Sequence, residues 1–180
     1  MTTQREKRIA QTVELLASLG MPLAQLNDRS ALCLLALLNL THNKKWSDAS
    51  NPLVGITPIM DWARAHYDKD YAPNTRETFR RQSMHQFVAA GLALYNPDEP
   101  LRSVNSPKAV YQIEPAALNL LRSVGTESWQ RNLLDYLKTS GTLAATYAGE
   151  REQNLIPVAL PTGTTFALSA GELSGSATQI

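Results

Sequence analysis

The sequence has a single cysteine, no long apolar run and almost no net charge. With Cys33 alone, an internal disulfide bond and a zinc site built on several cysteines are excluded. Cys33 lies within the apolar run 31–38, where a buried, reduced thiol is expected. No apolar stretch approaches the ~20 residues of a membrane span, and the polar, charged segment 1–8 is unlike a signal peptide. These absences predict a cytoplasmic protein with no membrane partner.

The charge and composition limit the possible partners. The 180 residues carry a formal net charge of +1, with 43% hydrophobic and 18% charged residues, which is ordinary for a globular domain with its own core. A charge this small gives no general attraction to polyanions. Any nucleic-acid binding must therefore depend on local groups of basic residues.

Two helices are predicted in the first forty residues. Apolar residues recur at helical spacing over 5–19, and Gly20 follows as a stop signal. Either Asn27 or Asp28 then caps a helix over 29–39. Its apolar residues point in nearly every direction, which is typical of a central, buried helix.

A third helix is predicted after the polar segment 41–55, which is expected to be a loop. Thr57 has the side chain of an N-cap, and Pro58 suits the first helical position. The helical pattern fades near Tyr67.

The fourth predicted helix spans 74–90 and ends at Gly91. Asn74 can cap it, and Glu77, three residues later, completes an arrangement like a capping box. At 100° per residue one face is formed by Phe79, Ser83, Phe87 and Ala90, flanked by Met84 and Val88.

The pattern after this helix changes to two short strands. Strands are predicted at 92–95 and 109–113, separated by the turn-rich 96–100 and the polar 102–108. Three helices followed by a two-stranded ribbon with a long tip is the order of a winged helix. We therefore predict a mainly α fold, a winged helix-turn-helix with two extra helices, 114–121 and 127–138, and a C-terminal β-hairpin over 155–168.

Three parts are expected along the chain. Residues 1–138 form the winged-helix domain and 139–153, rich in small and polar residues, form a linker. Residues 154–180 hold the hairpin and a Ser/Gly/Ala-rich tail, and they are expected to begin a further domain.

The outward face of the fourth helix is the best candidate binding surface. Arginine side chains suit the guanine edge and glutamine side chains suit the adenine edge. The outward positions are Thr78, Arg81, Gln82 and His85. The helix start offers free amides and positive charge for phosphate through Asn74, Thr75 and Arg76. Arg80 falls beside the core face, where it either reaches a phosphate or pairs with an acid.

The ribbon tip is the second candidate surface. Its polar side chains suit phosphate or minor-groove contact and comprise Arg102, Ser103, Asn105, Ser106 and Lys108. Over residues 71–108 five basic residues stand against three acidic ones, a local charge of +2. Weak non-specific affinity for DNA is therefore expected. The opposite hypothesis, an ordinary solvated helix face, remains open.

No catalytic site or cofactor site is predicted. His42, His66 and His85 lack metal-ligand spacing, and the chain has no phosphate-binding glycine loop, serine nucleophile elbow or Cys/His pair. The Pro97-Asp98 pair lacks the second acid that a magnesium site needs, so a turn is the better interpretation.

Two stretches carry the most specific pattern in the chain. The first comprises residues 72–82 and 85–87, and the second comprises residues 90–92, 95–100, 104–107 and 110–113. Together they resemble the N-terminal helix-turn-helix region of the BsuBI/PstI family of type II restriction endonucleases. The similarity covers most of residues 5–140, and the segment 151–168 resembles the family's entry into its nuclease domain.

The resemblance implies a parent enzyme that cuts double-stranded DNA at a short palindrome with magnesium, as a dimer. Family members cut within CTGCAG. Their PD-(D/E)xK-type acids and lysine lie in a C-terminal nuclease domain, which corresponds to a region beyond residue 180, so no catalytic residue is carried over. What is carried over is the DNA-contacting helix, Asn74 to Phe87, and the wing, Arg102 to Lys108.

Three functional hypotheses follow. The first is the DNA-binding module of such an enzyme, with double-stranded DNA and the nuclease domain as partners. The second is a stand-alone winged-helix transcriptional regulator. The third is a winged helix used for protein contacts or dimerisation.

Overall fold

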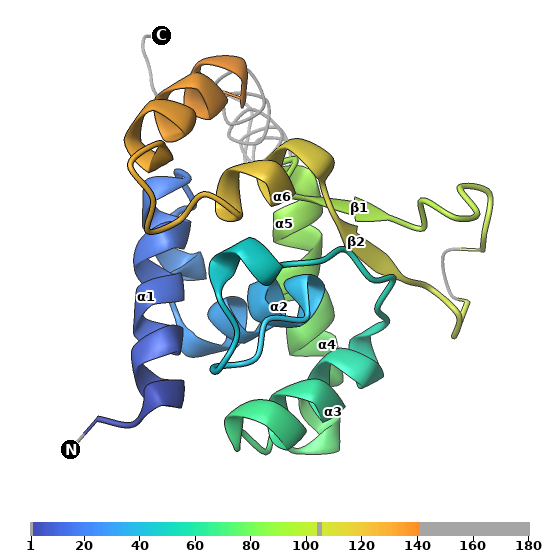
Figure 1. Cartoon of the computed structure of the whole chain (residues 1–180). Helices are drawn as coiled ribbons and strands as arrows, with labels where there is room; N and C mark the ends of the chain where they lie inside the picture. Colours follow the sequence, from blue (N-terminus) through green and yellow to red (C-terminus); the bar gives the residue numbers. More distant parts are fainter. Residues whose placement is uncertain (1, 104–105, 141–180) are drawn as a thin grey trace, which may run out of the picture. The chain divides into compact units, whose positions relative to one another are not determined.

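The computed structural model describes residues 2–103 and 106–140, which are mainly helical with one small antiparallel sheet (Figure 1). The central helix, α2 (Asp28–Leu38), contacts three helices and one strand: α1 (Gln4–Ser18), α3 (Ile56–Tyr67), the helix that comprises α4 (Arg76–Phe79) and α5 (His85–Ala89), and β2 (Tyr111–Ile113). In the part of the chain described, no helix is long and apolar enough to cross a membrane.

Helix α1 spans Gln4–Ser18 and confirms the first predicted helix. Thr3 begins it with a reciprocal cap, which was not predicted. The Thr3 hydroxyl accepts a hydrogen bond from the Glu6 amide at 3.1 Å, and the Glu6 carboxylate accepts one from the Thr3 amide at 2.8 Å. At the other end Gly20 has φ +88°, a left-handed conformation that glycine adopts without a steric penalty.

Helix α2 spans Asp28–Leu38, and Asn27 caps it by accepting a hydrogen bond from the Ser30 amide at 2.9 Å. Every residue from Ser30 to Leu38 is buried, so the prediction of a central helix is confirmed. Cys33 is fully buried, as expected, and this burial raises the pKa of its thiol to about 12.

Helix α3 spans Ile56–Tyr67 and ends where predicted, but it begins earlier than predicted. Its N-cap is Gly55, so the assignment of Thr57 as the cap and Pro58 as the first helical residue is wrong. The physical reason is a backbone pairing that the sequence pattern does not reveal. Val54 pairs with Tyr111 through two hydrogen bonds of 2.9 Å, and the chain turns into the helix directly after it.

The next helix runs without a break from Arg76 to Ala89 and contains a π-helical turn. Its segments are α4 (Arg76–Phe79), the π-helical turn Arg80–Met84 and α5 (His85–Ala89). The fourth predicted helix is therefore present, although its irregular middle was not foreseen.

The predicted start of this helix is wrong. Asn74 lies in a 3-10 turn, Pro73–Thr75, and the N-cap is Thr75, whose hydroxyl donates backwards to the Ala72 carbonyl at 2.6 Å. The capping box does not form, because the Glu77 carboxylate instead binds two arginines of its own helix.

Strand β1 (Ala93–Tyr95) pairs antiparallel with β2 (Tyr111–Ile113), with Tyr95 opposite Tyr111. Both strands are shorter than predicted. The loop between them extends away from the helices, and β2 also lies beside the segment that leads into α3 (Figure 1). Strand β2 therefore pairs with two segments that are distant from each other in sequence, β1 and Val54.

Helix α6 spans Pro115–Leu121, and the Glu114 carboxylate caps it by accepting from the Ala117 amide at 2.9 Å. Residues 129–140 form a further helix, so both extra helices are present and the second extends past its predicted end at 138. The remainder of the predicted linker and the hairpin at 155–168 lie outside the described residues.

Candidate nucleic-acid interface

The apolar face of the Arg76–Ala89 helix fixes which side chains can face outward. Phe79 and Phe87 are fully buried, and Tyr71 packs edge-on against Phe79 with ring centroids 4.9 Å apart. Ser83, between them, is also fully buried. Its hydroxyl accepts a hydrogen bond from Arg29 Nε at 2.9 Å and lies 3.1 Å from the Ser30 hydroxyl, as a buried polar group requires. The predicted inner face is confirmed.

Arg81 and Gln82 lie on the solvent side of this helix. The Arg81 side chain is 74% exposed and Gln82 is also exposed, in agreement with their predicted direction. Thr78, the third outward position, is half-buried. Two adjacent side chains of the types that bind base edges are therefore presented on a firmly packed helix, and their contact with DNA remains a prediction.

His85 does not share that face, and its predicted outward direction is wrong. Its ring lies 5.4 Å from the Tyr95 ring and 5.9 Å from the Tyr111 ring, between centroids. His85 directly follows the π-helical turn Arg80–Met84, which is wider than an α-helical turn, and its side chain packs against two tyrosines of the hairpin. Burial, together with the charge of Arg80, lowers the pKa of His85.

Glu77 holds two arginines on the same helix. Arg80 donates to both of its carboxylate oxygens, from Nε at 3.0 Å and from Nη2 at 2.7 Å, and Arg81 Nε donates at 3.1 Å. The hydrogen bond from Arg80 is the main cause that lowers the pKa of Glu77. Arg80 thus pairs with an acid, which is one of the two contacts predicted for it; the other was a phosphate. Exposed ion pairs of this kind are weak, so the arginines can exchange Glu77 for another anion.

Arg102 is held inside the hairpin loop. Its guanidinium donates to both Asp98 oxygens, at 2.9 and 3.1 Å, and to Asn96 Oδ1 at 3.0 Å. Asn96 is buried, has φ +49° and also accepts from the Val110 amide at 2.9 Å. Only 11% of the Arg102 side chain is exposed. Arg102 therefore fixes the shape of the loop, and the predicted phosphate contact would require it to leave these partners.

The other predicted contacts lie at the helix start and in the hairpin loop. The exposed ones are Asn74, Arg76, Ser103 and Lys108. Thr75 and Ser106 are half-buried, and Asn105 is outside the described residues. Arg76 Nε donates to the Thr57 hydroxyl at 3.2 Å, which ties the helix start to α3.

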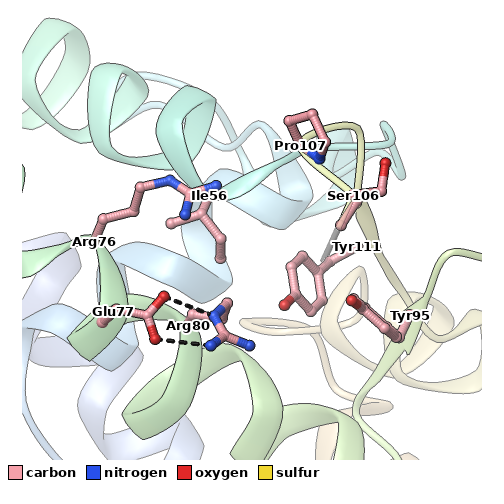
Figure 2. Close-up of a pocket in the computed structure, with 9 residues that line it drawn as sticks. Ile56, Arg76, Glu77, Arg80, Tyr95, Ser106, Pro107 and Tyr111 are labelled. Atoms are coloured by element: carbon pink, nitrogen blue, oxygen red, sulfur yellow. Dashed lines mark hydrogen bonds and ion pairs between the residues drawn. The ribbon is translucent and has the colours of Figure 1, made fainter. Parts of the chain in front are cut away.

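A pocket of about 370 Å³ lies between the start of this helix, the start of α3 and the hairpin (Figure 2). It joins residues from the two surfaces that were predicted separately: Arg76 and Arg80 from the helix, and Ser106 from the loop. The rest of its lining comprises Ile56, Glu77, Tyr95, Pro107, Ala109 and Tyr111.

Tyr95 and Tyr111 were missed as site residues. They face each other across β1 and β2 with ring centroids 5.1 Å apart. A signal was present for Tyr95, which ends the predicted strand 92–95 next to the turn, but Tyr111 lies in the middle of the predicted strand 109–113. Their rings line the pocket and form an aromatic cluster with the His85 ring. In that cluster the Tyr111 hydroxyl and His85 Nε2 are buried and have no hydrogen-bond partner among the residues that the structure describes.

The acidic and histidine side chains of the described region are dispersed. Within residues 2–103 and 106–140, no three His, Cys, Asp or Glu side chains gather into a group that could hold a metal ion.

The sequence is similar to two curated restriction enzymes. It is 52% identical over 174 residues to the Type II restriction enzyme BsuBI of Bacillus subtilis, a match that covers 97% of this chain and 55% of that protein. It is 33% identical to the Type II restriction enzyme AplI of Arthrospira platensis, covering 94% of this chain and 52% of that protein. The chain thus spans about half the length of these relatives.

The fold is similar to a solved structure described as that of the SdaI restriction endonuclease. The TM-score is 0.71 at 36% sequence identity, over 80% of this chain and 46% of that one. In addition, residues 6–145 match the family model described as the BsuBI/PstI restriction endonuclease HTH domain. That match includes both predicted surfaces and the pocket, and the chain belongs to the BsuBI/PstI restriction endonuclease family through this HTH domain.

Proposed function

We propose that this chain is the double-stranded-DNA-binding module of a type II restriction endonuclease and that its fold is a winged helix-turn-helix. In this assignment Arg76–Ala89 is the recognition helix and the β1–β2 hairpin is the wing. The observation that carries the proposal is the exposed Arg81–Gln82 pair, held outward by the buried Phe79 and Phe87 beside the hairpin. The family match favours it over a stand-alone transcriptional regulator.

The recognition helix reads bases through Arg81 and Gln82. A guanidinium can donate two hydrogen bonds to guanine, and a glutamine amide can both donate to and accept from adenine. Phosphate contacts come from Arg76 and Arg80, which line the pocket, and from Lys108, which is exposed in the hairpin loop between the pocket-lining Pro107 and Ala109. The arginines are partly neutralised by Glu77, so the affinity for DNA of arbitrary sequence is expected to be modest.

DNA cleavage is proposed for the whole restriction enzyme and not for the residues described here. In this proposal the whole protein cuts DNA at a short palindrome, for which CTGCAG is the first candidate, and uses magnesium held by a C-terminal nuclease domain. It acts as a dimer in the cytoplasm. No step of that reaction is assigned to the residues described above.

The proposal is tested by fluorescence-anisotropy titration of the chain with a CTGCAG duplex and a scrambled duplex at two salt concentrations. Specific binding that weakens with salt is expected. Arg81→Ala should reduce the preference for CTGCAG roughly 5- to 150-fold, the equivalent of ~1–3 kcal/mol for a bidentate contact to a base. Arg131→Ala is the control, since Arg131 is an exposed arginine on the separate helix 129–140.

Three results would change the proposal. Salt-sensitive binding without sequence preference would make the module a clamp on the phosphate backbone. An equal loss in Arg81→Ala and Arg131→Ala would remove the recognition role of the helix. Absence of binding at low salt would favour the third hypothesis, a winged helix used for protein contacts.

A further inference from the structure

Tyr111 places an unsatisfied hydroxyl against the pocket between the helix and the hairpin. The residue is fully buried, yet it lines the pocket, and its hydroxyl has no hydrogen-bond partner in the described part of the chain. Leaving a buried polar group unpaired costs folding free energy, so such groups are rare unless they serve a ligand or hold a solvent molecule. The unpaired hydroxyl therefore favours a bound ligand or solvent molecule in this pocket.

The wall opposite Tyr111 is cationic. Arg80 uses Nε and Nη2 to bind Glu77, and its remaining nitrogen points into the same space as the Tyr111 hydroxyl (Figure 2). Arg76 lines the outer side of the pocket. Two arginines against the single carboxylate of Glu77 leave this lining with a net positive charge.

The hydrogen-bond donors that line the pocket determine which type of ligand it can bind. A tyrosine hydroxyl with its ordinary pKa of about 10 is protonated at neutral pH and can donate a hydrogen bond, and burial and Tyr95 raise the pKa of Tyr111 further. A guanidinium also only donates. A hydroxyl and a guanidinium that face one space favour a group with several acceptor oxygens and negative charge.

We propose that this pocket binds one phosphodiester group of the DNA backbone, with the Tyr111 hydroxyl and the guanidinium groups of Arg80 and Arg76 as donors. The inference rests on the proposed function and deepens it. The bound phosphate bridges the recognition helix and the wing, because the donors come from both elements. It thereby fixes the angle at which Arg81 and Gln82 approach the base edges.

The test uses Tyr111→Phe, which removes the hydroxyl and leaves the ring. The chain is titrated by fluorescence anisotropy with CTGCAG duplexes in which single phosphates are replaced in turn by neutral methylphosphonates. With the wild-type chain, one replacement should weaken binding far more than its neighbours. Tyr111→Phe should weaken binding to the unmodified duplex roughly tenfold, as expected for the loss of a hydrogen bond to a charged group.

The two perturbations should not add. At the sensitive phosphate, Tyr111→Phe and the methylphosphonate together should cost little more than either alone, because both remove the same hydrogen bond. Tyr71→Phe is the matched control, since Tyr71 packs on the buried side of the helix against Phe79. Arg76→Gln, at an exposed position, should show the same coupling to that phosphate and provides a second variant.

Full additivity at every phosphate, or unchanged affinity in Tyr111→Phe, would overturn the inference and mean that solvent satisfies the hydroxyl. A free-anion site is distinguished by titrating inorganic phosphate without DNA and following the tyrosine NMR signals. If inorganic phosphate saturates the site but Tyr111→Phe shows no coupling to any methylphosphonate, the inference of a DNA-phosphate site is also overturned. If the wild-type chain binds no DNA at all, the proposed function itself has failed, which is a different result.

Discussion

Glu77 is expected to restrain the recognition helix, and replacing it with glutamine tests this directly. In the free protein its carboxylate accepts hydrogen bonds from Arg80 at 2.7 and 3.0 Å and from Arg81 at 3.1 Å. Glu77 therefore occupies donors of both arginines and offsets part of their positive charge before a phosphate or a base binds. Glu77→Gln removes the competing charge and keeps the size of the side chain.

The size of the effect follows from the charges on this helix. Between residues 74 and 90 three arginines stand against one acid, so the substitution changes the local charge from +2 to +3. Each additional phosphate contact steepens the dependence of log K on log salt by about 0.9. Between 200 and 50 mM salt one such contact gives an extra gain in affinity of roughly 3.5-fold, and two contacts give roughly 12-fold.

The assay is a salt series of anisotropy titrations with the scrambled duplex. Glu77→Gln should bind it more tightly than the wild type and with a steeper salt dependence, while the preference for CTGCAG falls. Glu14→Gln on α1 is the control, because Glu14 is exposed and its loss changes the net charge equally. An unchanged slope in Glu77→Gln, or an equal gain in Glu14→Gln, would refute the restraint and leave only a general effect of charge.

Three further predictions concern the fold that carries this surface. Phe87→Ala should lower the free energy of unfolding by about 3–5 kcal/mol in a denaturant titration, because Phe87 is fully buried; a loss below ~1 kcal/mol would contradict this packing. Burial lowers the pKa of His85 below its usual 6.5, so the unfolded chain binds this proton more readily. The contribution of His85 to stability is thus complete above pH 6.5 and is lost as the pH falls through the folded-state pKa, and urea titrations of His85→Gln should lack this decline. The Cys33 thiol, with its pKa raised to about 12 by burial, should react with Ellman's reagent only after unfolding, and fast reaction of the native chain would show that α2 opens readily.

The parts of the fold that could be predicted are those that depend on the spacing of residue types within one short segment. The apolar run around Cys33, the Asn27 cap and the Phe79–Ser83–Phe87 face all follow from residue types at helical spacing, and the structure confirms them. The Arg81–Gln82 face was found in the same way, because it lies opposite residues that must be buried.

The missed features depend on contacts between distant segments or on alternative side-chain partners. Val54 pairs with Tyr111, a residue far along the chain, and no local pattern specifies that pairing. His85 follows the π-helical turn and packs against Tyr111, a residue far along the chain, and no local pattern specifies that contact. Glu77 and Arg102 are simple charged residues in sequence, and only the fold shows which partners each of them selects.

The pairing between Val54 and Tyr111 also has a consequence for folding. The two strands of the hairpin are close in sequence and can meet early, whereas Val54 must close a long loop, at an entropic cost, before it reaches β2. The pocket needs both events, since its lining includes Ile56 from one side and Tyr95 and Tyr111 from the other. We therefore expect the proposed phosphate site to assemble late in folding, so that a chain with all its helices but without this pairing would lack the site.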